Sequence, residues 1–104
     1  MERSYRLSQN SEFAKLFPLD FSGYTLYMDT TEAIKHYYYN GWFPGSFVYA
    51  LLINDTKLAM QRADYWHKGL VPQYIEWIEE RMPGETWGSE KIVNNWMNGF
   101  TNGN

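Results

Sequence analysis

The chain has 104 residues, which suits one domain with one hydrophobic core. A net charge of −3 excludes the basic footprint that nucleic-acid binding requires, and the absence of cysteine excludes disulfides, thiolate metal sites and a cysteine nucleophile. The longest apolar run, residues 47–53, is too short to cross a membrane, and the N-terminus has no apolar secretion signal. We therefore expect a cytoplasmic protein with no nucleic-acid or membrane partner.

Aromatic side chains make up 19% of the chain, with nine Tyr, six Phe and five Trp. This is more than the core of one small domain ordinarily uses, since each ring buries a large area. We expect some rings to lie on a surface that meets a ligand or another chain, and the alternative is an unusually aromatic core.

Residues 1–28 show no steady hydrophobic period, so we expect an irregular N-terminal arm packed on a core domain of residues 29–104. Within the arm, a short helix from Asn10 should stop before Pro18, and residues 24–27 have the composition of a short strand. The arm serves either as a dimer contact or as a cover for the core.

The first long helix is predicted to start at Asp29, with Glu32 completing a capping box, and to end at Gly41. The step Pro44-Gly45-Ser46 then starts a second helix, residues 47–53, which is apolar all round. Such a helix is buried from every side. It is therefore the predicted central element.

Further helices follow from their caps and stops. Asp55 and Asp64 are predicted N-caps, Pro72 kinks or starts the next helix, and Ser89 caps the last. The helix near Pro72 carries two apolar stripes, one of them with Tyr74 and Trp77, and two stripes predict two partners. We expect a mainly α fold: a single-domain bundle of about four to five helices around one buried apolar helix.

A candidate ligand site lies at the start of the second helix, where free backbone N–H groups follow Gly45 and Ser46. Arg62 falls on the predicted inward face of its helix, and a buried guanidinium needs an anion or a carboxylate partner. Asn54 and Trp87 are the candidates to orient the ligand. The alternatives are a plain helix start and an internal pair of Arg62 with Asp55 or Asp64.

Catalysis and metal binding have no sequence support. The two histidines, His36 and His67, lie on different segments without metal spacing and are predicted surface residues. No Ser-His-Asp order can be argued from spacing. We therefore predict no catalytic residue, no metal and no cofactor.

Several short motifs recur in a known group of proteins. They are Pro44-Gly45-Ser46-Phe47, Asn54-Asp55, Ala59-x-x-Arg62-Ala63-Asp64, Trp87-Gly88-Ser89 and Trp96. In this order they resemble a group of small, mostly uncharacterised proteins of tailed bacteriophages, which tend to have Pro-Gly-Gly-Phe at the first motif. Ser46 stands at the second Gly of that motif. The resemblance implies a phage accessory protein that counters or redirects a host system.

The leading hypothesis is a non-enzymatic phage protein that sequesters a small anionic ligand such as a nucleotide signal. Gly45, Ser46 and Arg62 would hold the anion, and Asn54 and Trp87 would orient it.

The rival hypothesis is an interaction protein that inhibits a host enzyme through an aromatic surface with Trp42, Tyr74 or Trp77. In either case the number of rings and stripes predicts a homo-oligomer.

Overall fold

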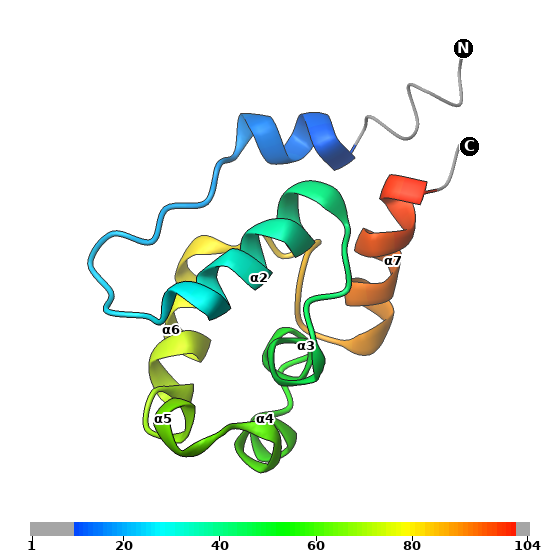
Figure 1. Ribbon diagram of the computed structural model, residues 1–104. Coiled ribbons are helices and arrows are strands. Elements are labelled where there is room, and N and C mark those ends of the chain that lie inside the picture. Colours follow the sequence, from blue (N-terminus) through cyan, green and yellow to red (C-terminus); the bar gives the residue numbers. More distant parts are fainter. Residues whose placement is uncertain (1–9, 102–104) are drawn as a thin grey trace.

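The computed structural model describes residues 10–101, and within them the chain is mainly helical and contains no strand. Residues 10–16 are helical, and the labelled helices are α2 (Met28–Asn40), α3 (Ser46–Leu52), α4 (Thr56–Arg62), α5 (Tyr65–Lys68), α6 (Val71–Arg81) and α7 (Glu90–Thr101) (Figure 1). The mainly α prediction is confirmed, but the predicted count of about four to five helices is wrong, because six helices, α2–α7, lie within residues 28–101. The strand predicted for residues 24–27 is wrong, because this segment pairs with no strand in the described range.

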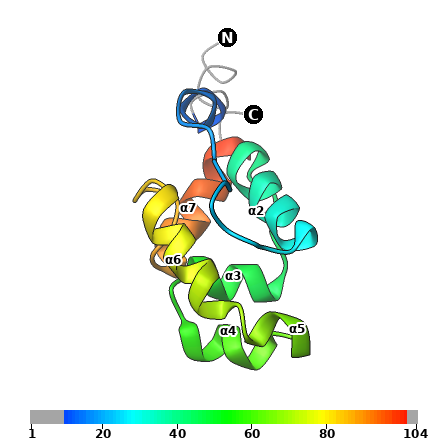
Figure 2. The same ribbon diagram turned by 90° about the vertical axis from the view of Figure 1, so that its left-hand side faces the viewer.

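Figure 1 shows α3 nearly end-on between α2 and α4. α3 contacts α2, α4 and α6, and α7 packs on α2. Figure 2, turned by 90°, shows α4 and α5 together at one end of the molecule and the helical residues 10–16 at the other. The amide of Asn10 donates to the backbone oxygen of Trp96 at 2.9 Å, which ties this segment to α7.

Most predicted helix ends are confirmed. The carboxylates of Asp55 and Asp64 accept the backbone N–H groups of Leu58 and His67, and Asn54 has the left-handed φ of 64° expected after a helix. The capping box of Asp29 and Glu32 is wrong. α2 begins one residue earlier, at Met28, without a side-chain cap. The carboxylate of Glu32 instead pairs with Lys35 at 3.2 Å.

The side of α3 that faces the core is buried, but its other side is only partly buried. Val48, Ala50, Leu51 and Leu52 are buried, whereas Phe47, Tyr49 and Ile53 are only partly so. The prediction of a helix buried on every side is therefore wrong for these three residues. The Tyr49 ring packs beside Phe43 near the surface, and Phe47 lines a cavity described below.

Two neighbouring tyrosines of α2 carry polar groups into the core. The hydroxyl of Tyr37 donates to the Thr86 carbonyl at 2.5 Å, and that of Tyr38 donates to the Phe17 carbonyl at 2.5 Å. Burial raises the pKa of Tyr38 to about 12 and raises that of Tyr37 further. Both hydroxyls therefore stay neutral donors, and Tyr38 holds the arm against α2.

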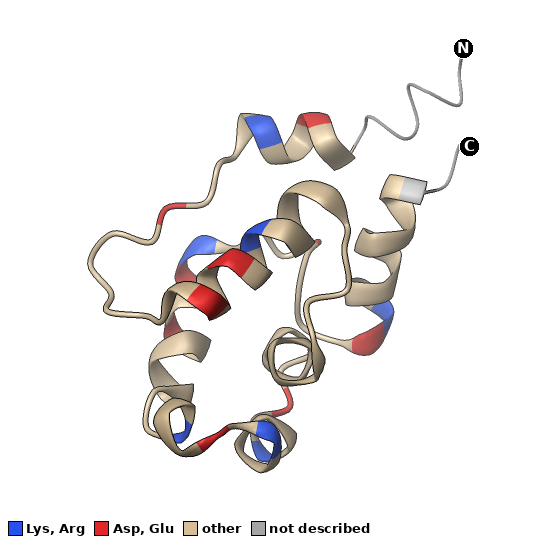
Figure 3. Ribbon diagram, in the orientation of Figure 1, with Lys and Arg blue, Asp and Glu red and all other residues tan. Residues whose placement is uncertain are grey.

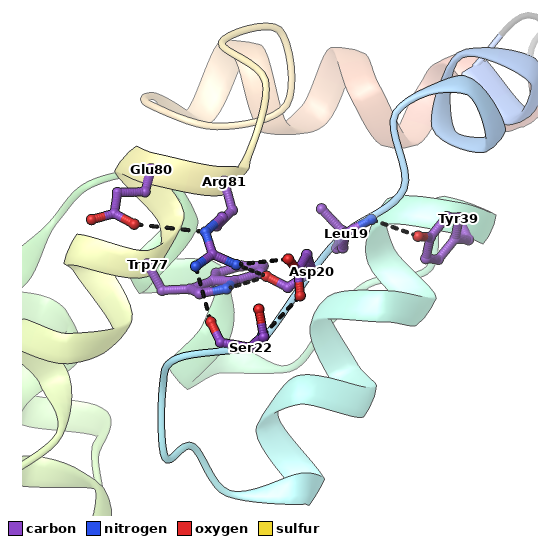
Figure 4. A network of polar contacts seen from close by, with 7 residues as sticks. All are labelled: Leu19, Asp20, Ser22, Tyr39, Trp77, Glu80 and Arg81. Atoms are coloured by element: carbon purple, nitrogen blue, oxygen red, sulfur yellow. Dashed lines mark hydrogen bonds and ion pairs between the residues drawn. The ribbon is translucent and has the colours of Figure 1, made fainter.

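The N-terminal arm covers the stripe of α6 that contains Trp77. The ring of Phe21 stacks on Trp77 at 4.4 Å between centroids, and the Trp77 indole N–H donates to the Asp20 carbonyl at 2.9 Å. Arg81 donates to the Ser22 carbonyl and pairs with the Asp20 carboxylate at 3.4 Å (Figure 4). The partner of this stripe is thus the chain's own arm. The division into an arm of residues 1–28 and a core of residues 29–104 stays a prediction.

Candidate functional site

The five predicted ligand residues fall at two ends of α3. Gly45 and Ser46 lie at its start, and Arg62 Nη1 donates to the Ser46 carbonyl at 3.2 Å. Asn54 follows its end, and Trp87 lies there too, because the next residue's N–H donates to Leu52 O at 2.7 Å. A helix of seven residues is about 10 Å long. The structure therefore brings together three of the five.

Arg62 is exposed, so the prediction that it lies on the inward face is wrong. Its guanidinium forms no ion pair within the described part of the chain. The internal pair with Asp55 or Asp64 is not made. Both carboxylates are occupied in capping their helices. The charge of Arg62 faces solvent.

The predicted aromatic surface is only partly present. Trp42 is 59% exposed, and its ring stacks on His36 with centroids 4.9 Å apart. Tyr74 and Trp77 are fully buried, so their assignment to a partner surface is wrong. The reason is that α6 packs one stripe on the core while the arm covers the other. Trp87 is partly buried, and its indole donates to Met82 O at 3.2 Å, as a ring sealing the core does.

An inner cavity of about 240 Å³ lies where the starts of α2 and α3 meet the end of α4. Its lining combines polar and apolar side chains: Asp29, Thr30, Ala33, Pro44, Phe47, Val48, Arg62, Asp64 and His67. Arg62 thus lines this cavity, whereas Gly45 and Ser46 do not. Ser46 contributes only its carbonyl, which accepts a hydrogen bond from the guanidinium.

His67 is the most closely held polar side chain of this cavity. Its Nδ1 lies 2.7 Å from Asp64 Oδ1, and its Nε2 lies 2.8 Å from Thr30 Oγ1. The side chain is only 17% exposed and packs among the rings of Tyr27, Phe47 and Tyr74. The prediction of a surface histidine is therefore wrong for His67.

Asp64 is ionised at neutral pH. Hydrogen bonds from the side chain and the backbone N–H of His67 hold the pKa of this carboxyl below its usual range. One oxygen of Asp64 thus accepts from both groups, at 2.7 and 2.8 Å.

Two more cavities, of about 490 and 370 Å³, lie next to the inner cavity and share lining residues with it or with each other. We refer to them as the middle and the outer cavity. Asp29, Asp64 and His67 line both the inner and the middle cavity, and Tyr27 and Trp66 line both the middle and the outer one. We call the three together the His67 groove. Its rim is rich in exposed apolar side chains: Tyr27 at 42%, Trp66 at 66%, Met28 at 75% and, next to Trp66, Tyr65 at 82%.

Charges of both signs surround the groove. Figure 3 shows acidic segments at the start of α2 and in the link between α4 and α5, with a basic segment on α4. Among the residues lining the inner cavity, Arg62 carries the permanent positive charge and Asp29 and Asp64 the negative ones. The charge of Arg62 therefore favours an anionic group of a ligand. The carboxylates of Asp29 and Asp64 favour groups that donate hydrogen bonds.

Thr30 and His67 were not among the predicted site residues. The spacing Asp64-x-x-His67 was a signal, because a helix N-cap lies close to the side chain three residues on. No sequence pattern indicated Thr30, because it lies 37 residues from His67 along the chain.

Comparison of the chain with models of protein families, with curated proteins and with solved structures finds no match in any of the three. Over residues 10–101, no group of three or more His, Cys, Asp or Glu residues could hold a metal ion. No helix in that range has the length and apolar character needed to span a bilayer.

Proposed function

We propose that this chain is a phage accessory protein that acts against a host system by binding a small anionic ligand of the nucleotide type in the His67 groove. The phage-like motif series supports the role as a phage accessory protein. Arg62 and the aromatic rings of the groove support the binding of a small anionic ligand. In this proposal the protein works in the host cytoplasm as a homo-oligomer, with α3 as the central helix of its bundle.

The observation that carries the proposal is the position of Arg62. Its guanidinium is exposed, is held by the Ser46 carbonyl at 3.2 Å, and lines a cavity of about 240 Å³. A guanidinium matches phosphate oxygens with paired N–H donors, which makes arginine the usual residue for such groups.

The remainder of the groove suits the ring of a nucleotide. Trp66 and Tyr27 line the middle and outer cavities and are 66% and 42% exposed, so their rings are candidates for stacking with a base. Asp29 and Asp64 offer acceptors to N–H groups of the base edge. Asn54 and Trp87, at the other end of α3, have no part in this arrangement.

The test is the affinity of Arg62→Ala for a panel of mono-, di- and cyclic nucleotides, measured by calorimetry. Removing a charged hydrogen-bond partner costs about 1.5–3 kcal/mol, so the affinity should fall by roughly 10-fold to 150-fold. Lys57→Ala is the matched control, because it removes one positive charge from the exposed face of the same helix outside the cavity. Its affinity should equal that of the parent.

Stability separates this role from a structural one. Because Arg62 is exposed and forms no ion pair in the described part of the chain, its loss should cost under about 1 kcal/mol of unfolding free energy. A parent protein that binds no member of the panel contradicts the proposal. So does an Arg62→Ala protein that loses binding only because it melts far below the parent.

A second candidate is an interaction protein that inhibits a host enzyme. Trp42 and Phe43 favour it, because these adjacent rings in the α2–α3 connection are 59% and 62% exposed. Exposed aromatic side chains are enriched at protein interfaces. Capture of a host enzyme by the parent but not by Trp42→Ser would support it, provided that nucleotide binding is absent from both.

A further inference from the structure

Three side chains of the His67 groove form one hydrogen-bonded chain. Thr30 Oγ1 lies 2.8 Å from His67 Nε2, and His67 Nδ1 lies 2.7 Å from Asp64 Oδ1. A hydroxyl, an imidazole and a carboxylate in this order are the parts of a nucleophile with its base and the group that orients the base.

The direction of the hydrogen bonds in the neutral imidazole follows from the carboxylate. An ionised carboxylate only accepts, so the short contact places the single proton of the neutral ring on Nδ1. In that form Nε2 carries the lone pair and accepts from the Thr30 hydroxyl. This is the tautomer that a general base needs in order to remove the hydroxyl proton.

We infer that Thr30, His67 and Asp64 form a nucleophilic site that hydrolyses small carboxylic esters bearing an anionic group. This inference goes beyond ligand capture, uses the inner cavity of the same groove, and does not require the ligand to be a nucleotide. Thr30 and His67 are the catalytic residues, and Asp64 is a positioning residue.

The reaction has two steps. Thr30 Oγ1 attacks the ester carbonyl carbon while His67 Nε2 takes the hydroxyl proton; the ester C–O bond then breaks, and the leaving alkoxide takes that proton from Nε2. A water molecule next attacks the acyl-threonine carbonyl and gives a proton to Nε2. The C–O bond between the acyl group and Thr30 Oγ1 then breaks, Thr30 Oγ1 takes the proton from Nε2, and the carboxylic acid leaves.

The cavity offers matching surroundings for such a substrate. Thr30 is only 5% exposed yet lines the inner cavity, where Phe47 and Val48 supply an apolar wall for an acyl group. Arg62 lines the same cavity and can hold the substrate's anionic group or the developing oxyanion.

The first experiment is covalent labelling with a fluorophosphonate, which transfers its phosphonyl group to an activated hydroxyl with loss of fluoride. The parent should gain one label, mapped to Thr30 by peptide mass spectrometry. Thr30→Ser should label as well, because it keeps the hydroxyl, and Thr30→Val should not. Thr31→Val is the control: its hydroxyl is bonded to the Met28 carbonyl, and its loss should leave labelling unchanged.

The second experiment is hydrolysis of p-nitrophenyl succinate, an ester with a free carboxylate. Loss of a positioned base typically costs about 10²- to 10⁴-fold, so His67→Gln should lower the rate by at least 10²-fold. For Asp64→Asn, kcat should fall and the pH profile should shift, while Thr30→Ser should retain activity.

An unlabelled parent whose hydrolysis rate equals that of Thr30→Val overturns the inference. Label on a residue other than Thr30 also overturns it. Because neither probe is a nucleotide, these outcomes are separate from a failure of nucleotide binding.

Discussion

At the scale of single residues, Asp64 shows how one local contact prepares a distant one. Its carboxylate caps α5 and fixes the His67 ring, and the far side of that ring then meets Thr30 on α2. The cap is a local property of the four consecutive residues 64–67. The contact with Thr30 additionally needs the start of α2 to lie close to α5.

Tyr38 gives a prediction about alkaline pH. Its pKa is raised to about 12 by burial, so its neutral form contributes stability that is fully present below the usual tyrosine pKa near 10. This contribution is lost as the pH rises from 10 to about 12. The unfolding free energy of the parent should therefore fall over that window, as measured by urea melts at successive pH values.

For Tyr38→Phe, the unfolding free energy should fall less steeply over the same pH window. At pH 7 this variant should be less stable by about 1 kcal/mol, because it loses the hydrogen bond to the Phe17 carbonyl. The difference from the parent should narrow as the pH rises. Tyr65→Phe, at a ring 82% exposed, is the control for removing a phenol. Parallel curves for the parent and Tyr38→Phe would contradict the prediction.

At the scale of elements, α3 shows what a fully apolar run means in a small domain. Leu51 and Leu52 are completely buried, while Phe47 and Tyr49 in the same helix reach partly open surroundings. A short helix can be apolar all round because one side fills the core and the other lines a cavity or meets surface rings.

Leu51→Ala tests the importance of α3. Removing a fully buried Leu costs about 2–5 kcal/mol, which lowers Tm by roughly 10 °C or more in a domain of this size. Ile53→Ala is the control within the same apolar run, since Ile53 is only partly buried and should cost less. A Tm for Leu51→Ala within about 2 °C of the parent would show that α3 is not central.

At the scale of the whole molecule, four of the nine large apolar side chains that are exposed within residues 10–101 lie at or beside the His67 groove. Tyr65 and Met28, at 82% and 75% exposed, lie on or beside the rim of the His67 groove together with Trp66. Large exposed apolar patches usually mark contacts with other molecules.

We therefore expect a homo-oligomer at high micromolar concentration, with a dimer mass or larger in light scattering. The double variant Met28→Ser and Tyr65→Ser should shift the protein towards the monomer. Lys68→Ala, an exposed change on the same helix as Tyr65, should not. A monomer mass for the parent would assign these side chains to ligand binding alone.

The sequence by itself determined the helices and most of their ends. Asp55, Asp64 and Ser89 cap helices because a short polar side chain reaches the backbone three residues on, whatever the fold. Gly41 ends α2 with φ 74°, which needs no tertiary contact. The apolar faces of α2, α6 and α7 follow from helical spacing alone.

Only the tertiary structure decided which faces meet. Tyr74 and Trp77 looked like a partner surface, yet α6 packs against the core and the arm brings Phe21 onto Trp77. Arg62 was predicted to face inward, but it is exposed. Thr30 and His67 meet across 37 residues, and such a contact depends on how helices cross in space, which local spacing does not encode.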